Sequence, residues 1–196
     1  MGRVLSPAMS AAFRTFHEEM GTTLRLNTLA TEIAPRGDGF ALTLSDGATL
    51  DTDAVIVAAG VVPNVELAAE AGLQIDNGVV VDARLLTSDP AISAIGDCAA
   101  HPNPYGGAGL IRLESVQNAV DQGKCIAARL TGNPQPYDAL PWFWSHQGAI
   151  KLQIAGLALG MDETVTRGDP ASAKFSVFVY RAGRLIAVES VNSPAD

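Results

Sequence analysis

The sequence is poor in the side chains that bind metal ions or form disulfides. Only two cysteines, Cys98 and Cys125, and three histidines are spread over the 196 residues. Thiols this far apart form neither a Cys-x-x-Cys pair nor part of a zinc site, so we expect free or buried thiols. With so few histidines, a metal cluster is not expected either.

Basic residues are also scarce. The chain has 13 Lys and Arg against 21 Asp and Glu, which gives a net charge of −8 and a pI near 4.8. Proteins that bind nucleic acids gather positive charge against the phosphates, so we exclude DNA and RNA as partners. Hydrophobic residues make up 47% of the chain and are sufficient for a core.

Long hydrophobic runs are absent. No segment approaches the roughly 20 apolar residues of a membrane-spanning helix, and the first residues lack the apolar stretch of a secretory signal. We therefore expect a cytoplasmic protein that makes no contact with a membrane.

The sequence also has no G-x-G-x-x-G loop, the strand-to-helix turn that holds the pyrophosphate of a dinucleotide. The nearest string, Gly107–Arg112, has no third glycine and follows a segment rich in Pro and Asn. We predict an ordinary loop there.

Hydrophobic periodicity predicts the elements of the first third. A helix is expected from Ala8 to Met20, with Gly21 as its C-cap. The continuous apolar run Asp53–Gly60 predicts a strand buried on both faces of an α/β sheet. Period-two alternation predicts an antiparallel meander, with turns at 37–39 and 46–47, over residues 24–26, 31–33 and 40–44.

The remaining elements become richer in strands toward the C-terminus. A long helix is predicted from Ser115 to Leu130, ended by Gly132 and Pro134. Shorter elements are a helix over 65–72 and strands over 79–81, 94–95, 151–155, 175–180 and 185–189.

Two polar segments are candidate binding elements. In Ile95-Gly96-Asp97, the glycine permits a tight turn that presents a carboxylate to the hydroxyl groups of a ligand. A helix that begins near Ser115 or Val116 directs its first N–H groups and its positive dipole end at whatever precedes it. Each also has an ordinary structural explanation, as a Gly-Asp turn and as a packed helix with a Ser N-cap.

The surrounding residues resemble one family. The run Thr87–Ala99 is similar to the second flavin motif of flavoprotein reductases with two dinucleotide domains, and Asp53–Asn64 is similar to their crossover between the NAD and FAD domains. The resemblance implies that Asp97, at the Gly96 turn, holds the ribityl chain of FAD. It also implies that the pyrimidine edge of the flavin meets the backbone of Val116, which follows Glu114 and Ser115 in this segment.

An aromatic segment narrows this family. Pro141–Gln147, with Lys151–Leu157, resembles the ferredoxin reductase branch of the FAD-dependent pyridine nucleotide-disulfide oxidoreductase superfamily, which includes the putidaredoxin, rhodocoxin and biphenyl-dioxygenase ferredoxin reductases. In that branch, the residue that matches Trp144 lies close to the flavin on the side that the ferredoxin approaches. Three positions depart from the usual Asp, Tyr and Asp of the family, namely His146, Gly148 and Ala149.

The resemblance implies an α/β fold with remnants of two Rossmann-like, dinucleotide-binding domains and a strand-rich α+β interface domain. We assign residues 1–60 to a partial NAD-binding domain, 61–137 to the C-terminal segment of the FAD-binding domain and 138–196 to a shortened C-terminal interface domain. Because both glycine loops are missing, FAD affinity should be weak, and residues 1–60 should expose sheet edges and apolar surface.

The implied function is part of an NAD(P)H:ferredoxin oxidoreductase. Such an enzyme takes hydride from NAD(P)H onto FAD and passes single electrons to the [2Fe–2S] ferredoxin of an oxygenase system, and a homodimer is compatible with it. No residue of this chain is expected to transfer protons in catalysis. The alternatives are a non-catalytic, self-associating module and a fragment of a related disulfide reductase.

Overall fold

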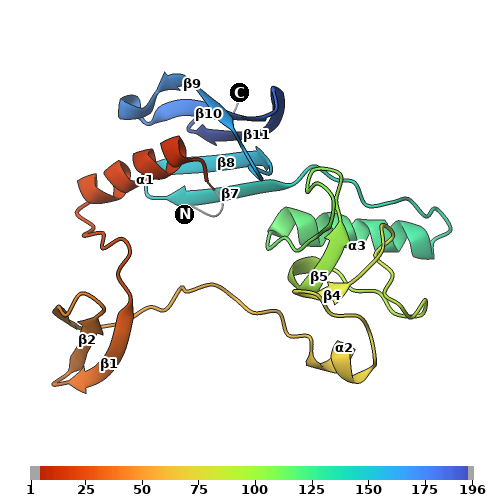
Figure 1. Ribbon diagram of the computed structural model, residues 1–196, viewed down its shortest axis with the longest axis horizontal. Helices are drawn as coiled ribbons and strands as arrows, with labels where there is room; N and C mark the ends of the chain where they lie inside the picture. The colour runs from red at the N-terminus through yellow and green to blue at the C-terminus, as the bar shows by residue number, and fades with distance from the viewer. Residues whose placement is uncertain (1–4, 194–196) are drawn as a thin grey trace. The chain divides into compact units, whose positions relative to one another are not determined.

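The computed structural model describes residues 5–193 (Figure 1). Contacts divide the chain into two compact units, one formed by residues 13–62 and the other by the N-terminal residues together with residues from Pro63 onward. The smaller unit holds an antiparallel meander, and the larger unit holds a five-stranded sheet, a smaller sheet and the helices α2 and α3. The candidate site lies in the larger unit.

The meander has the strand order β1-β2-β3, with β1 at Ala30–Arg36, β2 at Gly39–Leu44 and β3 at Thr49–Thr52. Both predicted turns are present, with Gly37 and Gly47 in the left-handed region at φ +60° and +85°. The strand predicted over residues 24–26 is wrong. None of the described strands includes or pairs with these residues, and Asn27, with a φ of 57°, turns the backbone between them and β1.

The segment 53–60 does not form the predicted buried strand. Ile56 is 92% exposed and Val57 is 75% exposed, and none of the described strands includes either residue. A strand buried on both faces needs hydrogen-bonded neighbours on its edges, and the described part of this chain pairs none with it. This part of residues 1–60 therefore exposes apolar surface, as we predicted from the lack of the glycine loops.

Helix α1 spans Pro7–Glu19, close to its predicted range. Ser6 caps its first turn, because the Ser6 Oγ accepts the Met9 N–H at 3.2 Å, and Pro7 at the first helical position has no N–H to satisfy. The predicted C-terminal signal is also present: Gly21 has a φ of +87°.

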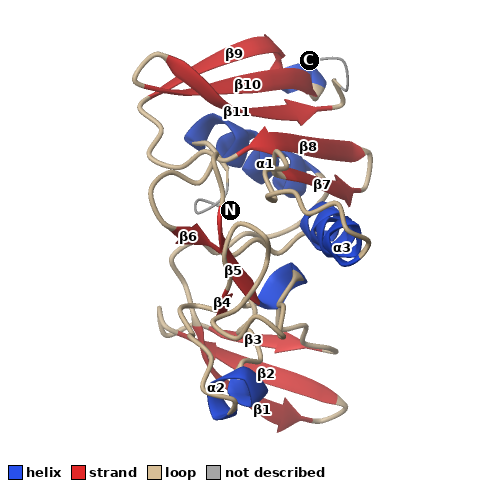
Figure 2. Cartoon of the chain, turned by 90° about the vertical axis from the view of Figure 1, so that its right-hand side faces the viewer, coloured by secondary structure: helices blue, strands red, loops and turns tan. Residues whose placement is uncertain are grey.

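The C-terminal third forms a five-stranded antiparallel sheet (Figure 2). The order is β7-β8-β11-β10-β9, and the bounds are Trp142–Gln147, Ile150–Gly156, Arg184–Val191, Lys174–Arg181 and Glu163–Asp169. This agrees with the predicted strand-rich C-terminus. The sequence did not predict β9, whose residues are all exposed and so carry no period-two burial pattern.

One face of this sheet is buried and carries alternating apolar residues such as Val177, Val179 and Val191. Glu189 lies on the same face, fully buried and opposite Val177 in the β10–β11 register. The Ser6 N–H donates to Glu189 Oε1 at 2.7 Å, and the Ser6 hydroxyl donates to Oε2. Burial raises the pKa of this carboxyl, and the two Ser6 hydrogen bonds partly oppose that effect.

The smaller sheet joins β4 at Val79–Val80, β5 at Ala99–Pro102 and β6 at Leu110–Ile111. Helix α2 spans Glu66–Glu70, and α3 spans Val116–Leu130. The strand predicted at Ala94-Ile95 is wrong. Ile95 is extended, but it leads directly into the 3-10 turn Gly96–Cys98, and the Gly96 N–H is bound by a side chain of α3 instead of a strand.

Within the described residues, no helix has the length and apolar character needed to cross a membrane.

The buried Glu189 predicts a specific pH dependence of stability. Because its pKa is raised in the folded state, the folded chain binds this proton more tightly than the unfolded chain, and its contribution to stability falls as pH rises through the raised pKa. We expect the free energy of unfolding of the wild type, relative to Glu189→Gln, to decrease between pH 5 and pH 7.5 in urea titrations. The matched control is Glu163→Gln at an exposed position of the same sheet, and a difference for Glu189→Gln that stays constant or grows with pH would contradict the prediction.

Candidate flavin half-site

The Gly96–Asp97 turn is the first part of the site. Gly96 is buried with a φ of +74°, a conformation that side chains other than glycine rarely adopt. A Cβ built on Gly96 would lie 3.7 Å from the Cβ of Ala119, so the turn packs directly on α3. Asp97 follows with an exposed side chain, which leaves its carboxylate open to a ligand.

The start of α3 is the second part. Ser115 is the N-cap, with an extended backbone and an Oγ that accepts the Asn118 N–H at 3.1 Å. The predicted helix start and Ser cap are therefore confirmed. The N–H groups of Val116 and Gln117 precede the first helical hydrogen bonds, and Val116 is 63% exposed. These donors and the positive end of the helix dipole face the space ahead of α3.

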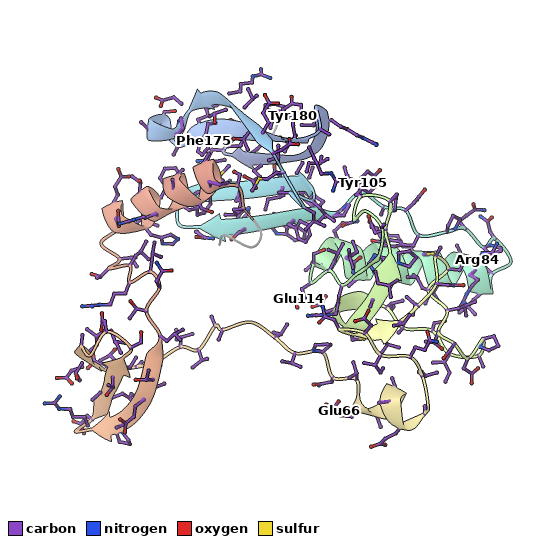
Figure 3. All side chains as sticks on the ribbon, viewed as in Figure 1. Glu66, Arg84, Tyr105, Glu114, Phe175 and Tyr180 are labelled. Atoms are coloured by element: carbon purple, nitrogen blue, oxygen red, sulfur yellow. The ribbon has the colours of Figure 1, made fainter. Side chains whose placement is uncertain are left out.

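Arg112 links these two parts. Its Nη1 donates to the Asp97 carbonyl oxygen at 2.9 Å and pairs with Glu114 Oε1 at 2.7 Å. The Arg112 side chain is 10% exposed, whereas that of Glu114 is 43% exposed. Figure 3 labels Glu114 beside the smaller sheet near α3. One guanidinium thus ties the backbone of the turn to the residue just before the helix cap.

Trp144 is connected to this region through its neighbour Trp142. Its ring lies 4.8 Å from that of Trp142, centroid to centroid, on the β7 strand at the edge of the five-stranded sheet. The backbone N–H of Trp142 donates to Gln117 Oε1 at 3.1 Å, which joins β7 to the first turn of α3. Trp144 is 41% exposed, so much of its surface is available to another molecule.

These groups have the chemistry that a flavin nucleotide needs on one side. Asp97 supplies a carboxylate that accepts hydrogen bonds from hydroxyl groups, α3 supplies N–H donors for electron-rich ring atoms, and Trp144 supplies an apolar aromatic surface. The residues present therefore fit this part of the cofactor. The described residues contain no group of three or more His, Cys, Asp or Glu that could hold a metal ion.

Sequence reasoning missed the residues that hold the site together. Gln117 and Gln122 contribute hydrogen bonds to β7 and to the Gly96 turn, and Arg112 joins the turn to Glu114. Polar residues on one side of a long helix usually indicate a solvated face, so periodicity gives no signal for them. The adjacent basic and acidic residues at 112 and 114 were the one available sign of an ion pair.

Comparisons with known proteins identify the family of this chain. A family model described as pyridine nucleotide-disulphide oxidoreductase matches residues 1–123, and a second, described as reductase C-terminal, matches residues 142–196. The chain belongs to the pyridine nucleotide-disulphide oxidoreductase family. Its mixed α/β architecture with several sheets is the fold expected for a part of such a protein.

Similar proteins are ferredoxin reductases. Rhodocoxin reductase of Rhodococcus erythropolis is 54% identical over 197 residues, which cover 100% of this chain and 46% of the relative. Putidaredoxin reductase CamA of Pseudomonas putida is 41% identical over 198 residues, 99% of this chain and 46% of the relative. The chain thus spans about half the length of the curated relatives it matches, and the predicted ferredoxin reductase branch is confirmed.

Solved structures give the same result. The crystal structure of a ferredoxin reductase from Rhodopseudomonas palustris superposes with a TM-score of 0.96 at 53% identity, covering 100% of this chain and 48% of that one. A covalent putidaredoxin reductase–putidaredoxin complex gives a TM-score of 0.93 at 41% identity, covering 98% of this chain and 46% of the other.

The N-cap of α3 makes a testable contribution to stability. Ser115→Ala removes the acceptor of the Asn118 N–H, and we expect the free energy of unfolding to fall by about 1 kcal/mol, the usual effect of losing a Ser cap. Ser115→Asp retains a capping oxygen and should stay within a few tenths of a kcal/mol of the wild type. Urea denaturation followed by circular dichroism measures both, and equal stabilities of the Ala and Asp variants would show that the cap does not hold the helix.

Proposed function

We propose that this chain is the C-terminal half of an NAD(P)H:ferredoxin oxidoreductase, which passes electrons from NAD(P)H through FAD to a ferredoxin that serves an oxygenase. The observation that supports it most directly is the joining of three separate segments into one open half-site. Arg112 joins the Gly96–Asp97 turn to the start of α3, and Gln117 joins α3 to the tryptophan pair of β7.

Ferredoxin reductases of this family are FAD enzymes that use NAD(P)H. FAD, when bound, supplies the centre that accepts a hydride and releases single electrons. In our proposal, Asp97 at the Gly96 turn holds the ribityl hydroxyls, and the backbone at Val116 meets the pyrimidine edge. Glu114 and Ser115, which directly precede Val116, complete this part of the site. N–H donors placed there stabilise negative charge on the ring, which raises the flavin potential. Trp144 covers the ring on the side open to the partner, and none of these residues transfers a proton.

The proposed partner is a [2Fe–2S] ferredoxin. Two observations support a ferredoxin: one similar structure is a complex of putidaredoxin reductase with putidaredoxin, and Trp142 and Trp144 are both more than one third exposed on an edge strand. A homodimer and a cytoplasmic location remain predictions of the same proposal, as does the division into segments of an NAD-binding domain (1–60), an FAD-binding domain (61–137) and an interface domain (138–196).

A second candidate is a non-catalytic module. Two observations favour it: the larger unit has a five-stranded antiparallel sheet with a buried apolar face, and the sequence lacks both glycine loops. We expect the isolated chain to show a weak flavin absorbance band near 450 nm after incubation with excess FAD and removal of free cofactor. No band would favour the module as the state of the chain on its own.

The flavin contacts are tested best when the missing cradle is restored. In a chimera that joins the N-terminal half of rhodocoxin reductase to this chain, Asp97→Ala should weaken FAD retention by about tenfold or more, since a carboxylate that binds hydroxyl groups is lost. Trp144→Ala should lower the rate of ferredoxin reduction by NADH or NADPH. Trp142→Ala is the control, because it removes the aromatic pair but keeps Trp144 and its proposed flavin contact. Unchanged FAD retention and unchanged ferredoxin reduction in both the Asp97 and Trp144 variants would overturn the proposed site.

A further inference from the structure

Helix α3 carries two fully buried amide side chains, Asn118 and Gln122, one turn apart on the side that packs on the Gly96 turn. A buried amide is costly unless its polar atoms are paired. The proposed contacts of the flavin site do not use either side chain. Their hydrogen bonds therefore need an explanation of their own.

Gln122 holds the Gly96 turn. Its Oε1 accepts the Gly96 N–H at 2.7 Å, the hydrogen bond that a neighbouring strand would otherwise supply. Its Nε2 donates to Asn118 Oδ1 at 3.2 Å and lies 3.3 Å from His101 Nδ1. Burial lowers the pKa of His101, so the ring beside this amide is neutral at neutral pH. With oxygen and nitrogen both engaged, the Gln122 amide has one orientation.

Asn118 holds the start of α3. Its Nδ2 donates to the Leu113 carbonyl at 3.1 Å, and its backbone N–H donates to the Ser115 hydroxyl. Its Oδ1 accepts from Gln122 and also from the Tyr137 hydroxyl at 3.0 Å. Asn118 is thus bonded to Leu113 and Ser115, which lie in the segment that leads into the helix, and to Gln122 one turn further along α3.

The two amides form a continuous chain of hydrogen bonds from Gly96 to Leu113, shielded from water. We propose that Gln122 and Asn118 are positioning residues, which fix the Gly96–Asp97 turn against the N-terminus of α3 so that the Asp97 carboxylate and the helix N–H groups address the same ligand. This inference rests on the proposed flavin site. Hydrogen bonds of this kind are strengthened by the low local dielectric, which suits a role in holding two segments rigidly.

The first test uses the chain itself. In hydrogen-exchange NMR, Gln122→Leu should make the Gly96 amide exchange at least tenfold faster, while amides of β10 such as Val177 keep their protection. Gln122→Glu retains an oxygen acceptor and should restore much of the Gly96 protection. Gln135→Leu is the matched control, because Gln135 is exposed and bonds only within its own loop and to Cys125.

A measurement on the unmodified chain covers the case in which the Leu variant does not fold. A through-hydrogen-bond scalar coupling between the Gly96 nitrogen and the Gln122 side-chain carbonyl carbon should be detected. Its absence, or Gly96 exchange in folded Gln122→Leu that equals that of the wild type, would overturn the inference.

The second test separates this inference from the proposed function. In the chimera with the N-terminal half of rhodocoxin reductase, Gln122→Leu should weaken FAD retention about tenfold and shift the flavin midpoint potential, whereas Gln135→Leu should change neither. If Gln122→Leu frees Gly96 but leaves retention and potential unchanged, the positioning role is wrong and the flavin site stands. If Asp97→Ala and Trp144→Ala both leave FAD retention and ferredoxin reduction unchanged while Gly96 stays protected, the flavin site is wrong and the hydrogen-bond chain is only structural.

Discussion

The packing of α3 against the Gly96 turn is the constraint on which the candidate site depends. No strand among the described residues pairs with Gly96, and its N–H is satisfied by Gln122 from the helix. On the same helix, the Gln117 side chain accepts the backbone N–H of Trp142, and Ser115 caps the first turn. Segments as far apart in sequence as Gly96 and Trp142 therefore converge on one helix. A displacement of α3 would separate the carboxylate, the N–H donors and the tryptophans together.

In two places in this chain, a buried polar side chain holds one segment against another by hydrogen bonds. Glu189 lies on the apolar face of the five-stranded sheet and is satisfied by Ser6 at the start of α1. Gln122 lies on the buried side of α3, and its polar atoms are satisfied by Gly96 and Asn118. In each case an unpaired group would be costly in the interior, so the contact specifies one arrangement of two segments. Apolar packing alone tolerates small shifts that such directional bonds do not.

The exposed segment 53–60 shows the opposite situation. Its residues have the composition of a central strand, yet Ile56 and Val57 lie open to solvent. The chain spans about half the length of its relatives, and the described residues supply no strand to pair with this run. In the larger unit, by contrast, the five strands of the C-terminal sheet pair with one another and bury a common face.

Much was readable from the sequence by itself. Local signals gave α1, α3 with its Ser115 cap, the hairpin turns at Gly37 and Gly47 and the strands β8, β10 and β11, because caps, turns and periodicity depend on near neighbours in the chain. Motif resemblance predicted the family, which the family models confirm, and it also indicated Asp97, Val116 and Trp144 as flavin contacts, which stay predictions. The tertiary structure decided the rest: that 53–60 stays unpaired, that Glu189 is buried, and that Arg112, Gln117 and Gln122 connect the site. Hydrogen bonds between residues distant in sequence have no period to reveal them, and only the folded chain brings their partners within 3 Å or so.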